Sequence, residues 1–184
     1  MNLLYIILIA LALIFLWVVY LYNNLIALKN HVDESWSDID VQLKRRYDLI
    51  PNIVEAVRGY MRHEAQVLQK ITEARTTAMG AKTLGEKAEA ENILSQTLKS
   101  LFAVTENYPN LKASENFLQL QDELSDAENK IQAARRFYNS NVRDYNIKIQ
   151  QFPNNLLAKT LRFGKQDYFE ISAPTEREAP KVQI

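Results

Sequence analysis

The stretch SENFLQLQDELSDAENKIQAARRFYNSNVRDYNIKIQQ (residues 114–151) decides the fold class. Its apolar side chains recur at three- and four-residue spacing, namely Phe117, Leu120, Leu124, Ala127, Ile131, Ala134, Tyr138, Val142, Tyr145, Ile149 and, one residue beyond, Phe152. This is the period of one face of an α-helix, whereas a strand would alternate at every second residue. At 1.5 Å per residue such a helix is roughly 55 Å long. A helix with one long apolar face has to pack that face against other helices.

The other long segments have the same helical period. Residues 25–47 carry an apolar stripe that continues out of the N-terminal apolar segment, and residues 51–79 carry another, with Pro51 tolerated in the first turn. A TLGE motif of capping-box form opens a third helix over residues 83–107, which Pro109 ends. Four amphipathic helices joined by short turns bury their stripes against one another. We therefore predict an all-α fold, with a membrane helix followed by an up-down bundle of four long antiparallel helices.

The N-terminal segment LLYIILIALALIFLWVVYLY (residues 3–22) is apolar throughout, and no charged side chain precedes Lys29. Its length matches the ~30 Å hydrocarbon core of a bilayer. Trp17, Tyr20 and Tyr22 suit the interface at its end. A cleaved signal peptide would have a basic N-terminal region and a small-residue cleavage site after a shorter apolar stretch, and a core helix is rarely apolar on every face. We predict an uncleaved transmembrane anchor.

The predicted organisation is a transmembrane anchor (residues 1–22), a helical bundle (residues 23–171) and a disordered C-terminal tail (residues 172–184). Lys29 is the basic residue nearest the anchor, and the KRR motif at residues 44–46 follows just beyond the window in which basic residues set orientation. This favours the bundle on the cytoplasmic side. The chain has no cysteine, which excludes disulfides and thiol chemistry. Its 22 basic and 22 acidic residues balance, which argues against nucleic acid as a partner.

Several polar side chains border or enter the predicted apolar stripes. On a helical wheel, Glu64 lies near the centre of the second stripe, and a buried carboxylate needs a donor because burying it alone is costly. Asp40 and Arg46 border the first stripe, while Arg135 and Asn141 border the last. We predict that these five residues form a buried polar network. A lock on helix register is favoured over a functional carboxylate, because structural ion pairs resemble sites.

Four apolar side chains lie off the main stripes and are predicted to face outward. They are Val41 on the first helix and Leu118, Phe137 and Ile147 on the last. Single exposed apolar residues are normal on protein surfaces. If those around Phe137 form a patch of several hundred Å², an interaction surface becomes the better interpretation.

Searches for catalytic motifs return nothing. Neither His31 nor His63 is preceded by the glutamate of a Glu-x-x-His di-iron element, and HEAQV at residues 63–67 lacks the second histidine of a zinc protease motif. No nucleophile elbow, P-loop or glycine-rich dinucleotide motif occurs. We predict no catalytic residues, no metal site, no cofactor and no enzymatic activity.

Three stretches resemble a known family. They are residues 22–64, which include WSDIDVQLKRR and DLIPN, residues 109–153, which include ARRFYN, and FGKQDYFE at residues 163–170. Together they are similar to the LemA family of bacterial membrane proteins. Residues 84–100 look least typical of it. The resemblance implies a short N-terminal segment, one membrane span and long antiparallel helices. It implies no catalytic residue, and a relative that helps to build magnetosome membranes keeps membrane organisation open as a role.

We predict a single-pass protein of the bacterial cytoplasmic membrane that acts as a non-enzymatic scaffold or assembly module at the cell envelope. Its predicted partners are the bilayer, through residues 3–22, and unidentified membrane or envelope proteins, with self-association as a further alternative. A rival interpretation is a ligand-sensing bundle that uses a polar network around Glu64. A second rival, a membrane-associated hydrolase, would need clustered acids around a cavity.

Overall fold

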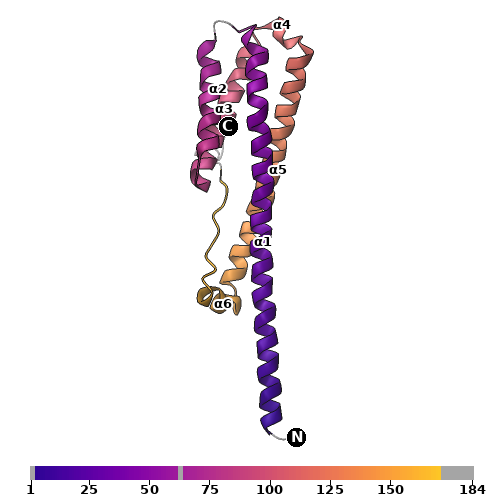
Figure 1. Ribbon diagram of the computed structural model, residues 1–184, viewed down its shortest axis with the longest axis vertical. Coiled ribbons are helices and arrows are strands. Elements are labelled where there is room, and N and C mark those ends of the chain that lie inside the picture. The colour runs from indigo at the N-terminus through magenta and orange to yellow at the C-terminus, as the bar shows by residue number, and fades with distance from the viewer. Residues whose placement is uncertain (1–2, 62–63, 171–184) are drawn as a thin grey trace, which may run out of the picture. The chain divides into compact units, whose positions relative to one another are not determined.

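The computed structural model describes residues 3–61 and 64–170, and within them it contains helices and connecting segments without a strand. This confirms the all-α prediction. The elements in Figure 1 are α1 (Leu3–Arg58), α2 (Ala65–Gly80), α3 (Leu84–Thr105), α4 (Pro109–Lys112), α5 (Glu115–Gln150) and α6 (Asn154–Thr160). The predicted tail, residues 172–184, lies outside the described residues.

Helix α1 confirms that the apolar N-terminal segment and the first amphipathic stripe form one helix. The predicted start of a second helix at Pro51 is wrong, because α1 continues through Pro51 to Arg58. A proline inside a helix costs about 3 kcal/mol. Ile50, Ile53 and Val57 are buried around it, and each such side chain contributes about 1.5–3 kcal/mol. Burial of this stripe therefore outweighs the proline.

Helix α3 begins where the capping-box motif predicts. The hydroxyl of Thr83 accepts a hydrogen bond from the Glu86 backbone N–H at 3.2 Å, and the Glu86 carboxylate accepts one from the Thr83 N–H at 3.1 Å. The long final helix is also confirmed, as α5. The single turn α4 was not predicted, and Pro109 stands at its first position, where a missing N–H costs nothing.

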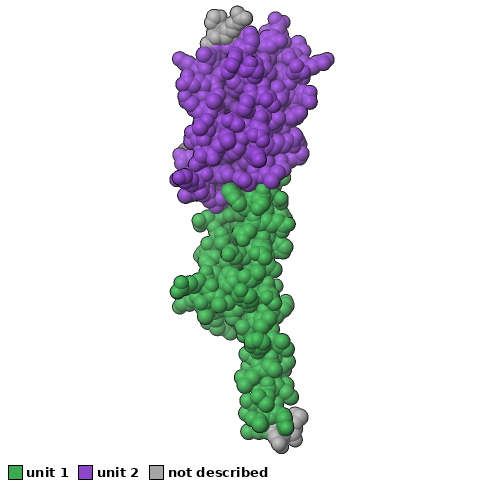
Figure 2. Space-filling model, viewed as in Figure 1, with its two compact units in different colours: residues 1–39, 133–168 green, residues 40–132, 169–184 purple. Residues whose placement is uncertain are grey.

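The chain divides into two compact units (Figure 2). Unit 1 comprises residues 1–39 and 133–168, and combines the first part of α1 with the last part of α5 and α6. Its core contains Leu25, Val32, Val142 and Tyr145. The Trp36 ring lies edge-on to the Tyr138 ring, with centroids 5.6 Å apart.

Unit 2 comprises residues 40–132 and 169–184, and combines the last part of α1, helices α2 to α4 and the first part of α5. Helices α2 and α3 pack against each other. The core is filled by side chains from every one of its long helices, among them Leu43, Ile53, Ile71, Ala78, Leu94, Leu101, Phe117 and Leu124. The buried faces of these helices thus meet in the core of unit 2. The predicted bundle, residues 23–171, is divided between the two units.

The N-terminal part of α1 has a different character. Among the described residues, α1 is long and apolar enough to cross a membrane by length and composition, and none of its most apolar window is buried. Figure 1 shows this part of the helix extending beyond α6. Unlike the stripes of unit 2, its apolar surface has no described protein segment to cover it.

Candidate functional site

A buried arginine lies at the centre of unit 2. Arg46 is on α1, and 1% of its side chain is exposed. It forms ion pairs with Glu91 of α3, which is 3% exposed, and with Glu128 of α5, which is 33% exposed. Its Nη1 also donates to the Ser95 hydroxyl at 3.0 Å. One cation therefore joins three helices.

Burial and pairing act on Arg46 in opposite directions. Burial lowers its pKa, whereas the charge and hydrogen bond of Glu128 raise it. Pairing with Glu128 therefore opposes the effect of burial on the guanidinium. Because both Arg46 and Glu91 are removed from water, each charge depends on the other for compensation, and removal of Arg46 leaves the Glu91 carboxylate buried without its cation.

Tyr47 extends the network to the fourth helix. Its hydroxyl donates to the Glu91 carboxylate, and burial raises the pKa of Tyr47 to about 12. Its backbone carbonyl accepts a hydrogen bond from Arg75 Nε of α2 at 2.7 Å. Arg46, Tyr47 and their partners thus connect all four long helices of unit 2. These contacts fix the alignment of the helices along one another.

Ion pairs at the edge of the unit are more exposed. Lys87 Nζ lies 2.8 Å from Asp40, whose side chain is 59% exposed. Asp126 contacts Lys130 at 2.8 Å and Arg45 at 2.9 Å. Both contacts lower the pKa of Asp126, and the contact with Lys130 has the larger effect. Exposed pairs of this kind contribute little to stability, because water and salt screen them.

The predicted network residues do not come together as a group. Arg46 lies in a buried network, but its described acidic partners are Glu91 and Glu128, and Asp40 pairs with Lys87. Glu64 is half-buried and precedes α2 as its N-cap without a side-chain capping bond. The premise that Glu64 lies inside a helical stripe is therefore wrong.

The remaining predicted residues are placed as follows. Asn141 belongs to unit 1, where its Nδ2 donates to the His31 carbonyl at 3.3 Å. Arg135 is half-buried and belongs to the same unit. All four outward-facing apolar residues are exposed, namely Val41, Leu118, Phe137 and Ile147. Phe137 and Ile147 are ten residues apart on α5, so they lie about 15 Å apart along the helix.

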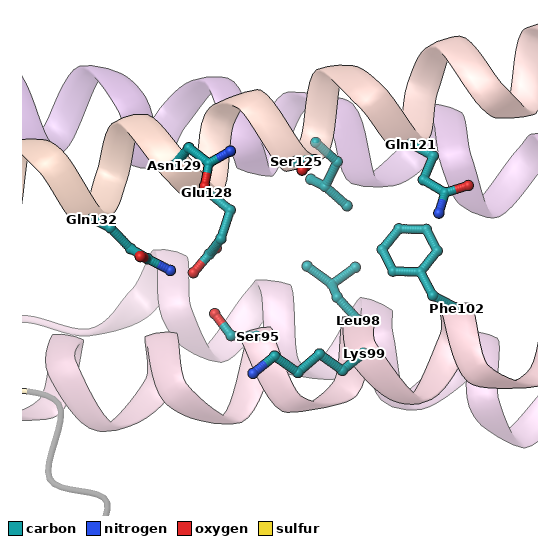
Figure 3. A pocket seen from close by; sticks show the side chains of 10 residues that line it. Ser95, Leu98, Lys99, Phe102, Gln121, Ser125, Glu128, Asn129 and Gln132 are labelled. Carbon is teal, nitrogen blue, oxygen red and sulfur yellow. The ribbon is translucent and has the colours of Figure 1, made fainter. Parts of the chain in front are cut away.

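A groove between α3 and α5 adjoins this network (Figure 3). Its cavity volume is about 260 Å³, and Figure 3 shows Ser95 and Glu128, both Arg46 partners, facing each other across it. Its floor is apolar, with Leu98, Phe102 and Leu124. Ligand pockets have volumes of about 300–1,000 Å³, so this groove is small for a drug-sized molecule.

A second cavity lies between the end of α1 and the start of α2. Its volume is about 440 Å³, and Met61 and Ala65, on either side of Glu64 in the sequence, belong to its lining. Arg58 is the charged residue among those that line it. Within the described part of the chain, no group of three or more histidine or acidic side chains is placed to hold a metal ion.

Comparison with known proteins identifies the family. The family model described as "LemA family" matches residues 35–184, which is most of the chain. The chain belongs to the LemA family. It is 30% identical to Protein LemA of Metamycoplasma hominis over 153 residues, which cover 82% of this chain and 69% of that protein.

Other relatives of this LemA-family chain are magnetosome proteins. It is 23% identical to magnetosome protein MamQ 2 of Paramagnetospirillum magneticum over 175 residues, or 81% of this chain and 64% of that protein. It is 21% identical to magnetosome protein MamQ of Magnetospirillum gryphiswaldense over 174 residues, or 80% and 64%. The chain thus spans less than two thirds of the length of the magnetosome relatives.

The acids that hold Arg46 in this LemA-family protein were not predicted from the sequence. A signal for Glu91 was present, because it stands three residues after Ala88 and three before Leu94, on the buried stripe of α3. The buried acid of the bundle was therefore readable from that stripe. Glu128 follows the buried Ala127 by one residue, so its spacing places it at the edge of the α5 stripe and not at its centre.

Proposed function

We propose that this protein is a single-pass, membrane-anchored helical bundle that acts as a non-enzymatic scaffold or assembly module at the bacterial cell envelope. The observation that carries the proposal is the contrast within α1. Its first part exposes an unbroken apolar surface, while its last part belongs to a bundle held by ion pairs and a filled core. A helix of this kind is stable when residues 3–22 are surrounded by lipid.

The scaffold role rests on what the bundle offers to partners. Its central acids are engaged by Arg46 and Tyr47, so they are not poised for chemistry. Its exposed apolar residues Val41, Leu118, Phe137 and Ile147 are available for contact with envelope proteins or with a second copy. The similarity to magnetosome proteins supports a role in which the protein acts at a membrane.

The proposed location is the cytoplasmic membrane, with the bundle in the cytoplasm, since the basic residue nearest the anchor, Lys29, follows it. A protease site added to the C-terminus tests the orientation in sealed cells. It should be cleaved only after the cells are opened. Cleavage in intact cells would place the bundle on the opposite side.

Extraction tests the anchor. The wild-type chain should remain with membranes after alkaline carbonate treatment. A Leu13→Arg, Leu16→Arg variant should be released, because each arginine near the middle of a span costs about 2.5–3.5 kcal/mol on insertion scales. A matched Leu13→Ala, Leu16→Ala variant should stay with the membrane. Release of the wild-type chain would contradict the anchor.

Site-specific photocrosslinking tests the scaffold. A photoreactive phenylalanine analogue at Phe137 or Val41 should capture a reproducible set of envelope proteins in native membranes. The neighbouring exposed positions Arg136 and Asp40 are matched controls, because adjacent helical residues point about 100° apart. Capture of the same protein alone would indicate homo-oligomeric assembly. Capture no different from the controls would refute the scaffold.

The second cavity favours one alternative, a ligand-sensing bundle. At about 440 Å³ it is large enough for a small molecule, and its lining includes the two described neighbours of Glu64. Native mass spectrometry of the full chain, released from its own membranes, should then detect a bound small molecule. A Leu68→Trp variant would fill the cavity and remove that mass, whereas Leu118→Trp, on the exposed surface, would not. Bare protein in every case would exclude the sensor.

A further inference from the structure

A short cationic segment lies next to the end of the apolar part of α1. We call residues 152–165 the α6 segment, which contains α6 and its flanks. Asn154 and Ala158 are buried and attach α6 to unit 1. Phe152, Leu156 and Leu161 are 80%, 60% and 48% exposed. Three large apolar side chains are thus left outside the core within ten residues.

The charge of this region is of one sign. Between Asp144 and Asp167 the sequence has four basic residues and no acidic one. The basic residues are Lys148, Lys159, Arg162 and Lys165, and the last three are exposed. The whole chain has zero net charge, so this is a local concentration of positive charge.

The segment is fixed in place by its own backbone. Arg162 has φ 58°, the left-handed conformation that normally favours glycine, and the Phe163 N–H donates to the Ala158 carbonyl at 2.9 Å. This ending turns the chain sharply after α6. The Phe163 ring then lies edge-on to the Tyr22 ring, with centroids 6.2 Å apart. Tyr22 is the last residue of the apolar run.

Helix α5 holds the residues that follow. The Tyr145 hydroxyl donates to the Gly164 carbonyl at 3.0 Å, and the Asn146 side chain both donates to and accepts from the Gln166 backbone, at 2.8 and 2.9 Å. The Tyr138 hydroxyl donates to the Asp167 carbonyl at 3.0 Å. The α6 segment is therefore held at both ends, beside the point where α1 would leave a bilayer.

We propose that the α6 segment is a second membrane contact, which binds the surface of a bilayer containing anionic phospholipids. The inference rests on the anchor of the proposed function and adds the lipid class and the residues that recognise it. Phe152, Leu156 and Leu161 enter the boundary between headgroups and acyl chains. Lys159, Arg162 and Lys165 meet lipid phosphates, with their aliphatic stems along the apolar surface.

The observations favour lipid over a protein occupant. Two copies joined through this segment would bring like charges together, which opposes association. The Tyr22–Phe163 contact connects the segment to the end of the span, so anchoring of α1 brings it to the headgroup level without a further partner. Exposed apolar side chains flanked by cations are the composition of interfacial membrane helices.

Fluorescence quenching in proteoliposomes tests the proposal on the full chain. The chain has no cysteine, so a Leu156→Cys variant carries a single environment-sensitive label. The vesicles are phosphatidylcholine alone, or equal parts of phosphatidylcholine and phosphatidylglycerol, each with a lipid nitroxide quencher near the headgroup. We expect stronger quenching of the label in the anionic vesicles, and a smaller difference at high salt. Equal quenching in both would overturn the proposal.

Matched variants isolate the charges. With Lys159→Gln, Arg162→Gln and Lys165→Gln together, the difference between the two vesicles should disappear. With three of the exposed lysines of unit 2 changed in the same way, namely Lys44, Lys70 and Lys82, the difference should persist. A difference that survives the first set and not the second would overturn the assignment of the cations.

Two further labels separate the possible failures. A Leu13→Cys label reports the anchor in vesicles whose nitroxide is placed deep in the acyl chains, because position 13 lies near the middle of the span. Quenching of this label without quenching at position 156 overturns the α6 contact alone. No quenching at either position overturns the proposed function as well. An Arg136→Cys label, about 20 Å from the end of α5, should stay unquenched. Disulfide formation between Leu156→Cys copies would overturn lipid contact in favour of self-association.

Discussion

Replacing Arg46 with methionine should destabilise the bundle more than any other single change of charge in unit 2. The substitution removes the cation from Glu91, a carboxylate that is 3% exposed. Removing one partner of a buried ion pair costs about 3–5 kcal/mol. In a chain of this size, 1 kcal/mol shifts Tm by about 2–4 °C, so the expected loss is about 6–20 °C. Circular dichroism of the full chain in detergent micelles measures it.

A double variant tests whether the loss comes from the uncompensated charge. Arg46→Met with Glu91→Leu removes both buried charges, and the remaining acid, Glu128, is 33% exposed and can be hydrated. We expect the double variant to recover much of the stability, with a coupling energy of about 1–3 kcal/mol. Two independent losses that simply add would contradict a direct interaction.

The neighbouring arginine is the matched control. Arg45 pairs with Asp126 at the surface, where its side chain is 41% exposed. Arg45→Met should cost about 1 kcal/mol or less, because exposed pairs contribute little. If Arg46→Met and Arg45→Met lower Tm equally, Arg46 is not the desolvated centre of the bundle and the reasoning fails.

Three smaller perturbations test other parts of the network and the helix ends. Tyr47→Phe should cost about 1–3 kcal/mol, because a buried carboxylate loses a donor. Burial raises the pKa of Tyr47 to about 12, so the wild-type chain should lose stability as pH rises from about 10 toward 12. A pH titration of the stability of the variant should lack that loss. Thr83→Ala should lower the free energy of unfolding by about 1 kcal/mol in denaturant titrations, since α3 loses its N-cap. Hydrogen bonds from the backbone N–H groups of Lys82 and then Thr83 lower the pKa of Glu86. The contribution of Glu86 to stability is therefore present above about pH 4.3 and is lost as pH falls through its pKa in the folded chain. Acid titration of the stability of Glu86→Gln should lack this loss. Arg162→Gly should raise Tm by about 2–4 °C, because glycine adopts φ 58° at about 1 kcal/mol lower cost, and a fall in Tm would contradict the strained turn.

Local signals predicted the helices best where they were complete. The TLGE motif placed the start of α3, since both hydrogen bonds of a capping box form within four residues. The stripe of residues 114–151 placed α5 to within a residue at each end. Pro51 misled, because its local cost is smaller than the tertiary burial of Ile50, Ile53 and Val57.

The same difference explains the error at Glu64. Its place on a helical wheel was correct only if a helix ran through it, and the chain instead leaves α1 after Arg58 and begins α2 at Ala65. Gly59 and Tyr60 form a turn there. Once the helix ends, the wheel no longer relates Glu64 to Val57 or Ile71, so its inward direction loses its basis.

By itself the sequence determined the all-α class, the separation of an uncharged N-terminal run from a charged remainder, and the outward position of residues such as Phe137. These follow from periodicity and composition, which are local properties of the chain. Only the tertiary structure decided that Arg46 meets Glu91 and Glu128. These acids are 45 and 82 positions from Arg46 in the sequence, so they reach it only when three helices pack together. It also decided that Phe163 lies against Tyr22. Pairing between distant residues depends on how the packed helices align with one another. That alignment is fixed by the burial of whole helix faces and not by any one motif.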